Sequence, residues 1–149
     1  TSDLNEYKDI ISFDNELPEY INDARGKIYI MDRYGLDYGL PLSYWSDDTS
    51  FEVNNYYVQD NYCIDDINEK KEDIIKAIEY KKNSDNIVIN FTSCYLDYGF
   101  PPTYAGSSAN KINPWFYDYI NESNMKLGIV VMDFMTMDLA KAIYMRNYL

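Results

Sequence analysis

The chain has 149 residues, an apolar fraction of 46% and a formal net charge of −12. This length allows one domain, over residues 1–149, but is too short for a complete eight-unit barrel of about 250 residues. The acidic balance argues against nucleic acid binding, because no basic stripe is available for the phosphates. Histidine is absent. A general acid/base enzyme would therefore have to shift the pKa of a carboxylate or borrow its base from elsewhere.

Four short apolar runs each end on acidic, amide, guanidinium or hydroxyl side chains. They are 28–31 before Asp32 and Arg33, 56–58 before Gln59 and Asp60, 87–91 before Thr92 and Ser93, and 127–132 before Asp133. Three of the runs precede a helix-like stretch, which is typical of parallel strands alternating with helices in an α/β fold. In such folds the carboxyl ends of the strands hold ligands. The four runs therefore predict one face of an active-site mouth.

The clearest predicted helix spans residues 65–82. Asp66 can cap its first turn, and Glu69 can complete a capping box. Lysines late in this helix suit the negative end of the helix dipole. The isoleucines on one stripe, which predict the buried face, are Ile67, Ile74, Ile75 and Ile78.

Two further helices are predicted. The pair Asn113–Pro114 is interpreted as a helix start, because proline fits the first helical position. The stretch 136–148 predicts the last helix, with Leu139, Ala140 and Ile143 facing inward.

Two loops, 35–45 and 96–104, are rich in glycine, proline and aromatic residues, and each follows a predicted strand. Such loops serve as lids, as ordered turns or as wedges into a bilayer interface. No run approaches the ~18 residues of a membrane span, and no signal peptide is expected.

The two cysteines, Cys63 and Cys94, follow the second and third predicted strands. A disulfide would require an oxidising compartment, and two free thiols are the favoured interpretation. No zinc ligand set occurs in the sequence, so we expect no structural metal.

Four segments in register resemble a known family. They span residues 24–34, 58–62, 89–93 and 128–133. Together they resemble the carboxyl-terminal half of the bacterial phosphatidylinositol-specific phospholipase C, over residues 23–146. The resemblance implies a partial (β/α)8 TIM-like barrel with about four parallel strands and flanking helices. It also implies a secreted enzyme that cleaves phosphatidylinositol to diacylglycerol and cyclic inositol phosphate, without a metal or other cofactor.

The resemblance assigns roles to four residues. Arg33 and Asp60 match residues that hydrogen-bond the inositol hydroxyls, and Tyr62 matches the ring that stacks on the inositol. Asp133 matches the catalytic carboxylate that orients the base. Each residue also has a structural alternative. Arg33 could form a salt bridge with Asp32 or Asp60, Tyr62 could be a core residue, and Asp133 could cap the last helix.

Two departures from the family pattern limit what the resemblance implies. The family's mouth loop carries a tryptophan where this chain has residues 99–102, which weakens the expectation of membrane insertion there. The catalytic histidines and the phosphate-binding arginine belong to the amino-terminal half of the family barrel. The isolated chain is therefore predicted to be inactive.

Three interpretations follow. The first is a segment of a phosphatidylinositol phosphodiesterase that supplies inositol recognition, and it is the one we favour. The second is a non-catalytic inositol or inositol-lipid binding module, and the third is an acidic interaction domain. In the first, the partners are the inositol or phosphatidylinositol head group and, transiently, a membrane surface. Half a barrel also exposes strand edges, which predicts association with the missing half or self-association.

Overall fold

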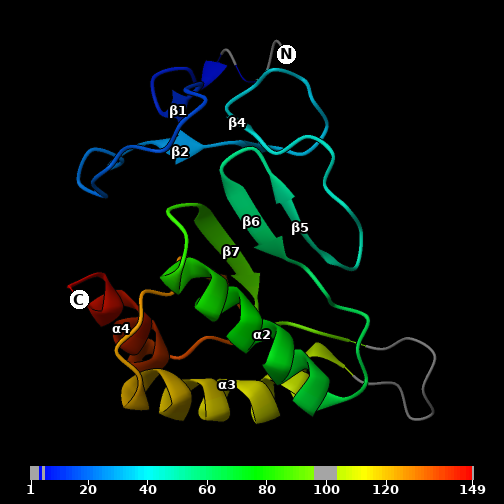
Figure 1. Ribbon diagram of the computed structural model, residues 1–149. Helices are drawn as coiled ribbons and strands as arrows, with labels where there is room; N and C mark the ends of the chain where they lie inside the picture. The colour runs from blue at the N-terminus through cyan, green and yellow to red at the C-terminus, as the bar shows by residue number, and fades with distance from the viewer. Residues whose placement is uncertain (1–3, 5, 96–103, 149) are drawn as a thin grey trace. The chain divides into compact units, whose positions relative to one another are not determined.

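The computed structural model describes residues 4, 6–95 and 104–148 (Figure 1). The chain divides into two compact units, Thr1–Trp45 and Ser46–Leu149. The interpretation of the whole chain as a single domain stays a prediction. Of the predicted mouth loop 96–104, all but Tyr104 lies outside the described residues.

The unit Thr1–Trp45 contains four very short strands. β1 (Ile11–Ser12) pairs in parallel with β2 (Ile28–Tyr29), and β3 (Met31–Asp32) pairs in parallel with β4 (Leu40–Pro41). The predicted strand over residues 28–31 is therefore divided between two two-stranded sheets. The expectation that it joins the other three runs in one parallel sheet was wrong.

A glycine permits the close approach of β3 and β4. Gly39 has φ +78°, and a Cβ at this position would lie 2.5 Å from the carbonyl oxygen of Ile30. Only glycine adopts this backbone conformation without strain and leaves that space free. Leu40 and Leu42, on either side of Pro41, are completely buried.

The unit Ser46–Leu149 has a four-stranded sheet in the order β5-β6-β7-β8. The strands β6 (Tyr56–Gln59), β7 (Ile87–Phe91) and β8 (Ile129–Val131) are parallel, as predicted from three of the apolar runs. β5 (Ser50–Val53) runs antiparallel to β6 and was not predicted. The unit is a mixed α/β fold.

The hairpin that adds β5 turns at Asn54 and Asn55. Val53 pairs with Tyr56, so the loop has two residues, and Asn54 has φ +52°. Asparagine tolerates this left-handed conformation better than most residues, which suits it to a two-residue hairpin loop.

The first long helix, α2 (Ile67–Lys82), agrees with its prediction. The carboxylate of Asp66 caps it by accepting a hydrogen bond from the backbone N–H of Asn68 at 2.8 Å. Lysines 81 and 82 occupy the last turn, as expected. Ile74 and Ile78 are completely buried.

The second helix begins earlier than predicted. α3 spans Ala105–Glu122, so Asn113 and Pro114 lie in its interior and not at its start. Proline removes one helical hydrogen bond, but this helix buries Ile112 and Phe116 on both sides of that position. Burial of this face offsets the cost of the proline, which a local sequence pattern does not reveal.

The last helix, α4 (Met137–Met145), continues into a 3₁₀ turn, η1 (Arg146–Tyr148). Thr136 caps it, because its hydroxyl accepts a hydrogen bond from the backbone N–H of Leu139 at 3.3 Å. Leu139 is buried, whereas Ala140 and Ile143 are half-buried.

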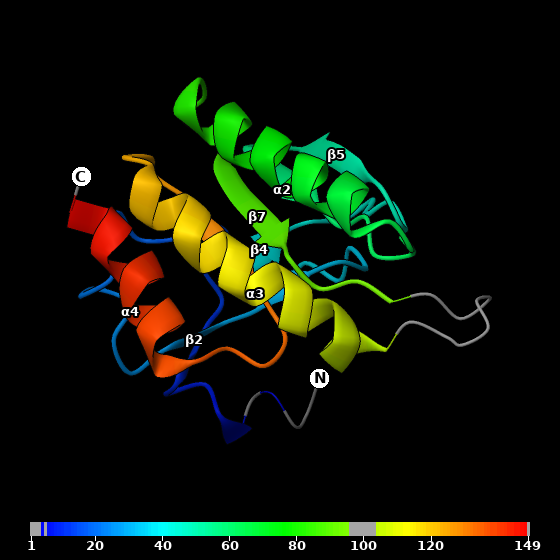
Figure 2. The same ribbon diagram turned by 90° about the horizontal axis from the view of Figure 1, so that it is seen from below.

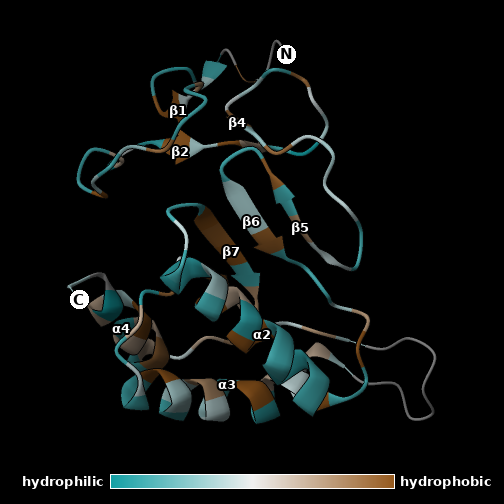
Figure 3. Cartoon of the chain, viewed as in Figure 1, coloured by the Kyte–Doolittle hydropathy of each residue, from teal (hydrophilic) through white to brown (hydrophobic). Residues whose placement is uncertain are grey.

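The helices pack together with the sheet around one apolar core. α2 lies on β6 and β7, and α3 lies between α2 and α4 (Figure 2). β7 is hydrophobic except for Asn90 near its carboxyl end, and Figure 3 shows this hydrophilic position in teal. None of the described helices has the length and apolar character that a membrane-spanning segment needs. The buried core residues are Ile74, Ile78, Cys94, Ile112, Phe116, Ile120, Leu127 and Leu139.

Candidate functional site

The carboxyl ends of β6, β7 and β8 meet at one edge of the sheet, because the three strands are parallel. Asp60 follows β6 directly and is 9% exposed, and Asp133 follows β8 after one residue and is half-buried. β7 separates these two strands, so the strand ends lie about 10 Å apart across the sheet. The structure therefore brings Asp60, Tyr62 and Asp133 to the same edge.

The segment after β6 is held by the loop that precedes β5. The backbone N–H of Asp60 donates to the carbonyl oxygen of Thr49 at 3.2 Å. One carboxylate oxygen of Asp48 accepts from the backbone N–H groups of Tyr62 and Cys63, at 2.9 and 2.8 Å. These bonds fix the backbone that carries two of the predicted inositol-binding residues.

Tyr62 is a half-buried residue of this edge and not part of the apolar core. Its hydroxyl donates to the carboxylate of Asp47 at 2.9 Å, and its ring stacks on Tyr95 with 5.4 Å between ring centroids. The hydrogen bond to Asp47, followed by burial, raises the pKa of Tyr62 to about 12. The hydroxyl is therefore neutral at physiological pH, and the ring is held from both its polar tip and one face.

Asp133 belongs to a loop that α3 holds in place. The side-chain amide of Asn113 donates to the carbonyl oxygens of Asp133 and Phe134, at 2.9 and 3.3 Å. Phe134 has φ +52°, which is strained for an aromatic residue, and its ring lies against Gly106. The alternative role of Asp133 as the helix cap is wrong, since Thr136 caps α4.

Arg33 lies in the other unit, Thr1–Trp45. It is exposed, and its guanidinium carbon lies 4.3 Å from the centre of the Trp45 ring, at cation–π distance. The convergence of Arg33 with Asp60, Tyr62 and Asp133 stays a prediction.

The carboxylate of Asp32, next to Arg33, organises the loop that follows β3. It accepts hydrogen bonds from the backbone N–H groups of Tyr34 at 3.0 Å and Leu36 at 2.6 Å. Burial acts to raise the pKa of Asp32, but these backbone donors outweigh it, so the pKa is lowered. Asp32 is thus ionised and is a structural residue of the loop.

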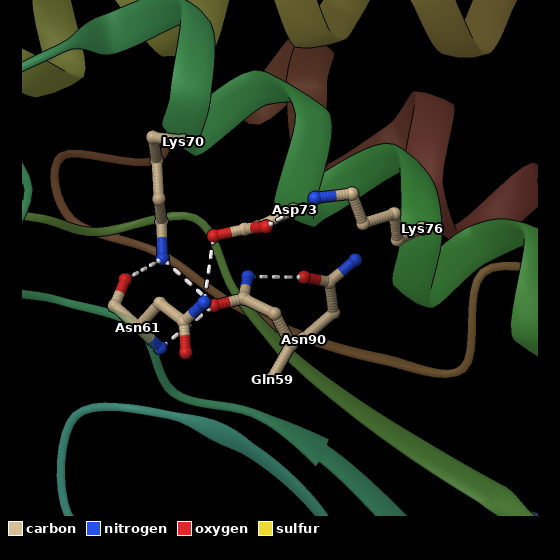
Figure 4. Close-up of polar contacts among 6 residues, drawn as sticks. All are labelled: Gln59, Asn61, Lys70, Asp73, Lys76 and Asn90. Atoms are coloured by element: carbon tan, nitrogen blue, oxygen red, sulfur yellow. Dashed lines mark hydrogen bonds and ion pairs between the residues drawn. The ribbon is translucent and has the colours of Figure 1, made fainter.

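A buried polar network lies directly behind the β6 and β7 ends (Figure 4). Gln59 and Asn90, both completely buried, are joined by a hydrogen bond from Gln59 Nε2 to Asn90 Oδ1 at 2.8 Å. Gln59 Nε2 also donates to the carbonyl oxygen of Phe91 at 2.8 Å, and Asn90 Nδ2 donates to that of Ile74 at 3.0 Å. The network ties the ends of β6 and β7 to α2.

Helix α2 contributes charged groups to the same network. Lys70 is completely buried, and its ammonium donates to Gln59 Oε1 at 2.9 Å and to the carbonyl oxygen of Asn61. Asp73 accepts from the side-chain amide of Asn61 at 2.6 Å and forms an ion pair with Lys76 at 3.0 Å. Sequence reasoning missed these residues. The sequence does contain a signal for this network. Lys70 lies on the same buried stripe of the helix as Ile67 and Ile74, and a buried lysine needs hydrogen-bond partners.

Neither a metal nor a disulfide site is found in the part of the chain that the structure describes. Over residues 4, 6–95 and 104–148, no three histidine, cysteine, aspartate or glutamate side chains cluster to bind a cation. Cys63 and Cys94 are free thiols. A separate cleft of about 420 Å³ lies beside the β8–α4 loop, with Asn113, Tyr117, Phe134 and Thr136 among its lining residues.

Comparison with known proteins gives structural likeness and no match by sequence. No protein-family model matches the chain, and no curated protein matches it. A pentafluorophenylalanine-containing phosphatidylinositol-specific phospholipase C from Staphylococcus aureus has a TM-score of 0.76 and 22% identity, over 97% of this chain and 55% of that chain. The phosphatidylinositol-specific phospholipase C from Listeria monocytogenes has a TM-score of 0.72 and 20% identity, over 98% of this chain and 56% of that chain.

A further S. aureus structure, described as concerning modulation of membrane binding, has a TM-score of 0.72 and 22% identity, over 93% of this chain and 53% of that chain. This chain thus spans about half the length of the phospholipases that it resembles. The likeness shows that it has the fold of that half of a bacterial phosphatidylinositol-specific phospholipase C.

Proposed function

We propose that this chain supplies the inositol-recognition half of a phosphatidylinositol phosphodiesterase. The inositol ring is bound by Asp60, Tyr62 and Arg33. Asp133 orients a base that the other barrel half provides. The whole enzyme cleaves phosphatidylinositol to diacylglycerol and cyclic inositol phosphate. The observation that carries the proposal is the presence of Asp60, Tyr62 and Asp133 at one edge of a sheet with this fold.

The chemistry of these side chains suits a polyol. The inositol ring offers hydroxyl groups that donate and accept hydrogen bonds, and charged partners strengthen such bonds. An aspartate at a strand end accepts from ring hydroxyls, and an aromatic ring covers the apolar C–H face of a sugar-like ring. Tyr62 suits the second role because its orientation is fixed by Asp47 and Tyr95.

The sheet supports a partial (β/α)8 barrel that the other barrel half completes. β8 is an outer strand of the four-stranded sheet among the described residues, and a parallel outer strand has unpaired backbone groups on one side. The missing barrel half, bearing the histidines, is the partner that fits this edge. Self-association is the alternative.

Secretion and transient contact with a membrane surface complete the proposal. The support is the likeness to phospholipases, one of which is described by its membrane binding. Phe134 and Met137 are 71% and 85% exposed at the same edge as the proposed inositol site, where apolar side chains can enter a bilayer interface.

Calorimetric titration with myo-inositol tests the recognition role. We expect binding by the wild-type chain, and at least a roughly tenfold loss in Tyr62→Ala, which removes the stacking ring. Tyr57→Ala is the matched control. Tyr57 is also half-buried, and its ring also stacks on a tyrosine, Tyr80, with 4.2 Å between the ring centroids. Equal affinity in the two variants would contradict the proposal.

A non-catalytic inositol-binding module is the second candidate, favoured by the absence of histidine from the chain. Release of cyclic inositol phosphate from phosphatidylinositol vesicles, measured for the chain and for the natural protein, distinguishes the phosphodiesterase from the binding module. The chain alone should release no cyclic inositol phosphate in either case. A natural protein whose intact mass includes the histidine-bearing half, and which does release it, supports the phosphodiesterase. A natural protein of this length that binds inositol supports the module.

A further inference from the structure

Lys70 is a completely buried lysine on the face of α2 that lies on the sheet. Burial of a charged side chain is costly unless hydrogen-bond partners replace the lost water. An apolar residue on this stripe of the helix would pack against the sheet without that cost. The location of the Lys70 partners therefore indicates what the charge does.

The two acceptors of the Lys70 ammonium lie at the end of β6 and in the segment that follows it. One is Gln59 Oε1, at the last residue of the strand, and the other is the carbonyl oxygen of Asn61. Gln59 Oε1 also accepts from the backbone N–H of Asn61 at 2.9 Å. Figure 4 shows Lys70 together with Gln59 and Asn61. The residue between these two in the sequence is Asp60, so the ammonium bridges the chain on both sides of Asp60.

We propose that Lys70 is a positioning residue that fixes the backbone of residues 59–62 and thereby holds Asp60 and Tyr62 in the orientation that receives the inositol ring. Lys70 itself does not touch the ring, because it is completely buried. The inositol part of this proposal rests on the proposed function. The fixing of residues 59–62 does not, and it can be measured without any ligand.

The charge of Lys70 should make this positioning sensitive to pH. Burial lowers the pKa of Lys70 to about 8, against the opposing effects of Cys94, Asp73, Asp60 and Asp48. The ammonium is therefore charged at neutral pH and becomes a neutral amine as the pH rises above about 8. Hydrogen bonds from a charged donor are stronger than those from a neutral one, so residues 59–62 should loosen over this range.

Lys70→Met separates positioning from stability. Methionine has a similar length but no donor, so the variant removes a charge that is costly to bury and also leaves two buried acceptors, Gln59 Oε1 and the carbonyl oxygen of Asn61, with fewer partners. Because these two effects oppose each other, we expect a thermal midpoint within a few degrees of the wild type, while the backbone of residues 59–62 loses the ammonium that bridges it. A purely structural role would instead lower the thermal midpoint and leave the fixing of residues 59–62 unchanged.

Backbone NMR of the 149-residue chain measures the fixing directly, from about pH 6.5 to about pH 9.5. In the wild type, the amides of Asn61, Tyr62 and Cys63 should shift with the same midpoint as the Lys70 Nζ resonance. Lys82→Met, the same substitution at an exposed position of α2, should preserve this behaviour. Lys70→Met should abolish the pH-dependent shift of these amides. Both cysteine thiols remain in this variant, so a shift caused by a thiol would persist. Amides that do not follow Lys70 in the wild type would overturn the proposal.

Titration with myo-inositol measures the consequence for binding. At pH 7, Lys70→Met should weaken affinity roughly tenfold, the worth of one charge-assisted hydrogen bond, and Lys82→Met should leave it unchanged. Unchanged affinity and unchanged amide positions in Lys70→Met would overturn the proposal. If the wild type binds no inositol, the proposed function fails, while a midpoint shared by Lys70 and the amides still supports the positioning role.

Discussion

The carboxyl ends of β6 and β8, the first and last of the three parallel strands, are held in different ways. The segment after β6 has a polar network behind it, in which Gln59, Asn90 and Lys70 are completely buried. The loop after β8 is held by hydrogen bonds from the Asn113 side chain and contains a strained residue, Phe134. In the proposed function, the end with the buried network carries the residues that bind the inositol ring, and the other end carries the carboxylate that orients a base.

The largest expected difference between the two ends is in inositol binding. Asp60→Ala removes a carboxylate that we place on the ring hydroxyls, so affinity for myo-inositol should fall by a factor of roughly ten or more. Asp133→Ala removes a carboxylate that we assign to a base on other polypeptide, so affinity should stay within about twofold. Calorimetry on the isolated chain measures both. A loss in Asp133→Ala as large as that in Asp60→Ala would contradict the division of roles.

A smaller difference is expected in stability. Asn90→Ala leaves buried groups of Gln59 and Ile74 with fewer partners and should lower the free energy of unfolding by about 2 kcal/mol. Asn113→Ala removes bonds to a half-buried loop and should cost about 1 kcal/mol. Urea denaturation of the two variants measures the order. The reverse order would show that the β8 end is the more firmly held.

The smallest effect concerns the ionisation of Tyr62. Its raised pKa means that the folded state favours the neutral phenol, so its contribution to stability is complete below pH 10 and is lost as the pH rises towards 12. Asp47→Asn removes the negative charge next to the hydroxyl and should move the pKa back towards 10. NMR of ¹³Cζ-labelled tyrosine follows this residue. An unchanged pKa in the variant would show that burial, and not Asp47, is the cause.

The sequence predicted the elements whose signals are local. Asp66 and Thr136 are found at helix starts, and three apolar runs form the parallel strands. The pair Asn113–Pro114 misled because the same dipeptide fits a helix start. It lies inside α3 because that helix has buried residues on both sides of it, which is a tertiary effect.

The sequence predicted the residues of the candidate site that follow the strands, but not the buried network behind them. Asp60 and Asp133 were recognisable because each follows an apolar run, whereas Asn90 lies within such a run and was assigned to the strand. The partners of Lys70 come close to it only in the folded chain, and no periodic pattern in the sequence predicts them. The position of Arg33 depends on how two units meet, which no local signal of the sequence specifies.

The most direct test of the central claim is an NMR map of the wild-type chain during titration with myo-inositol. We expect resonances of Asp60 and Tyr62 to shift together with the guanidinium of Arg33, because in the proposed function these three side chains bind one inositol ring, and we expect a smaller shift at Asp133, which does not bind it. Saturable shifts confined to other parts of the chain, or no shifts at millimolar inositol, would contradict it.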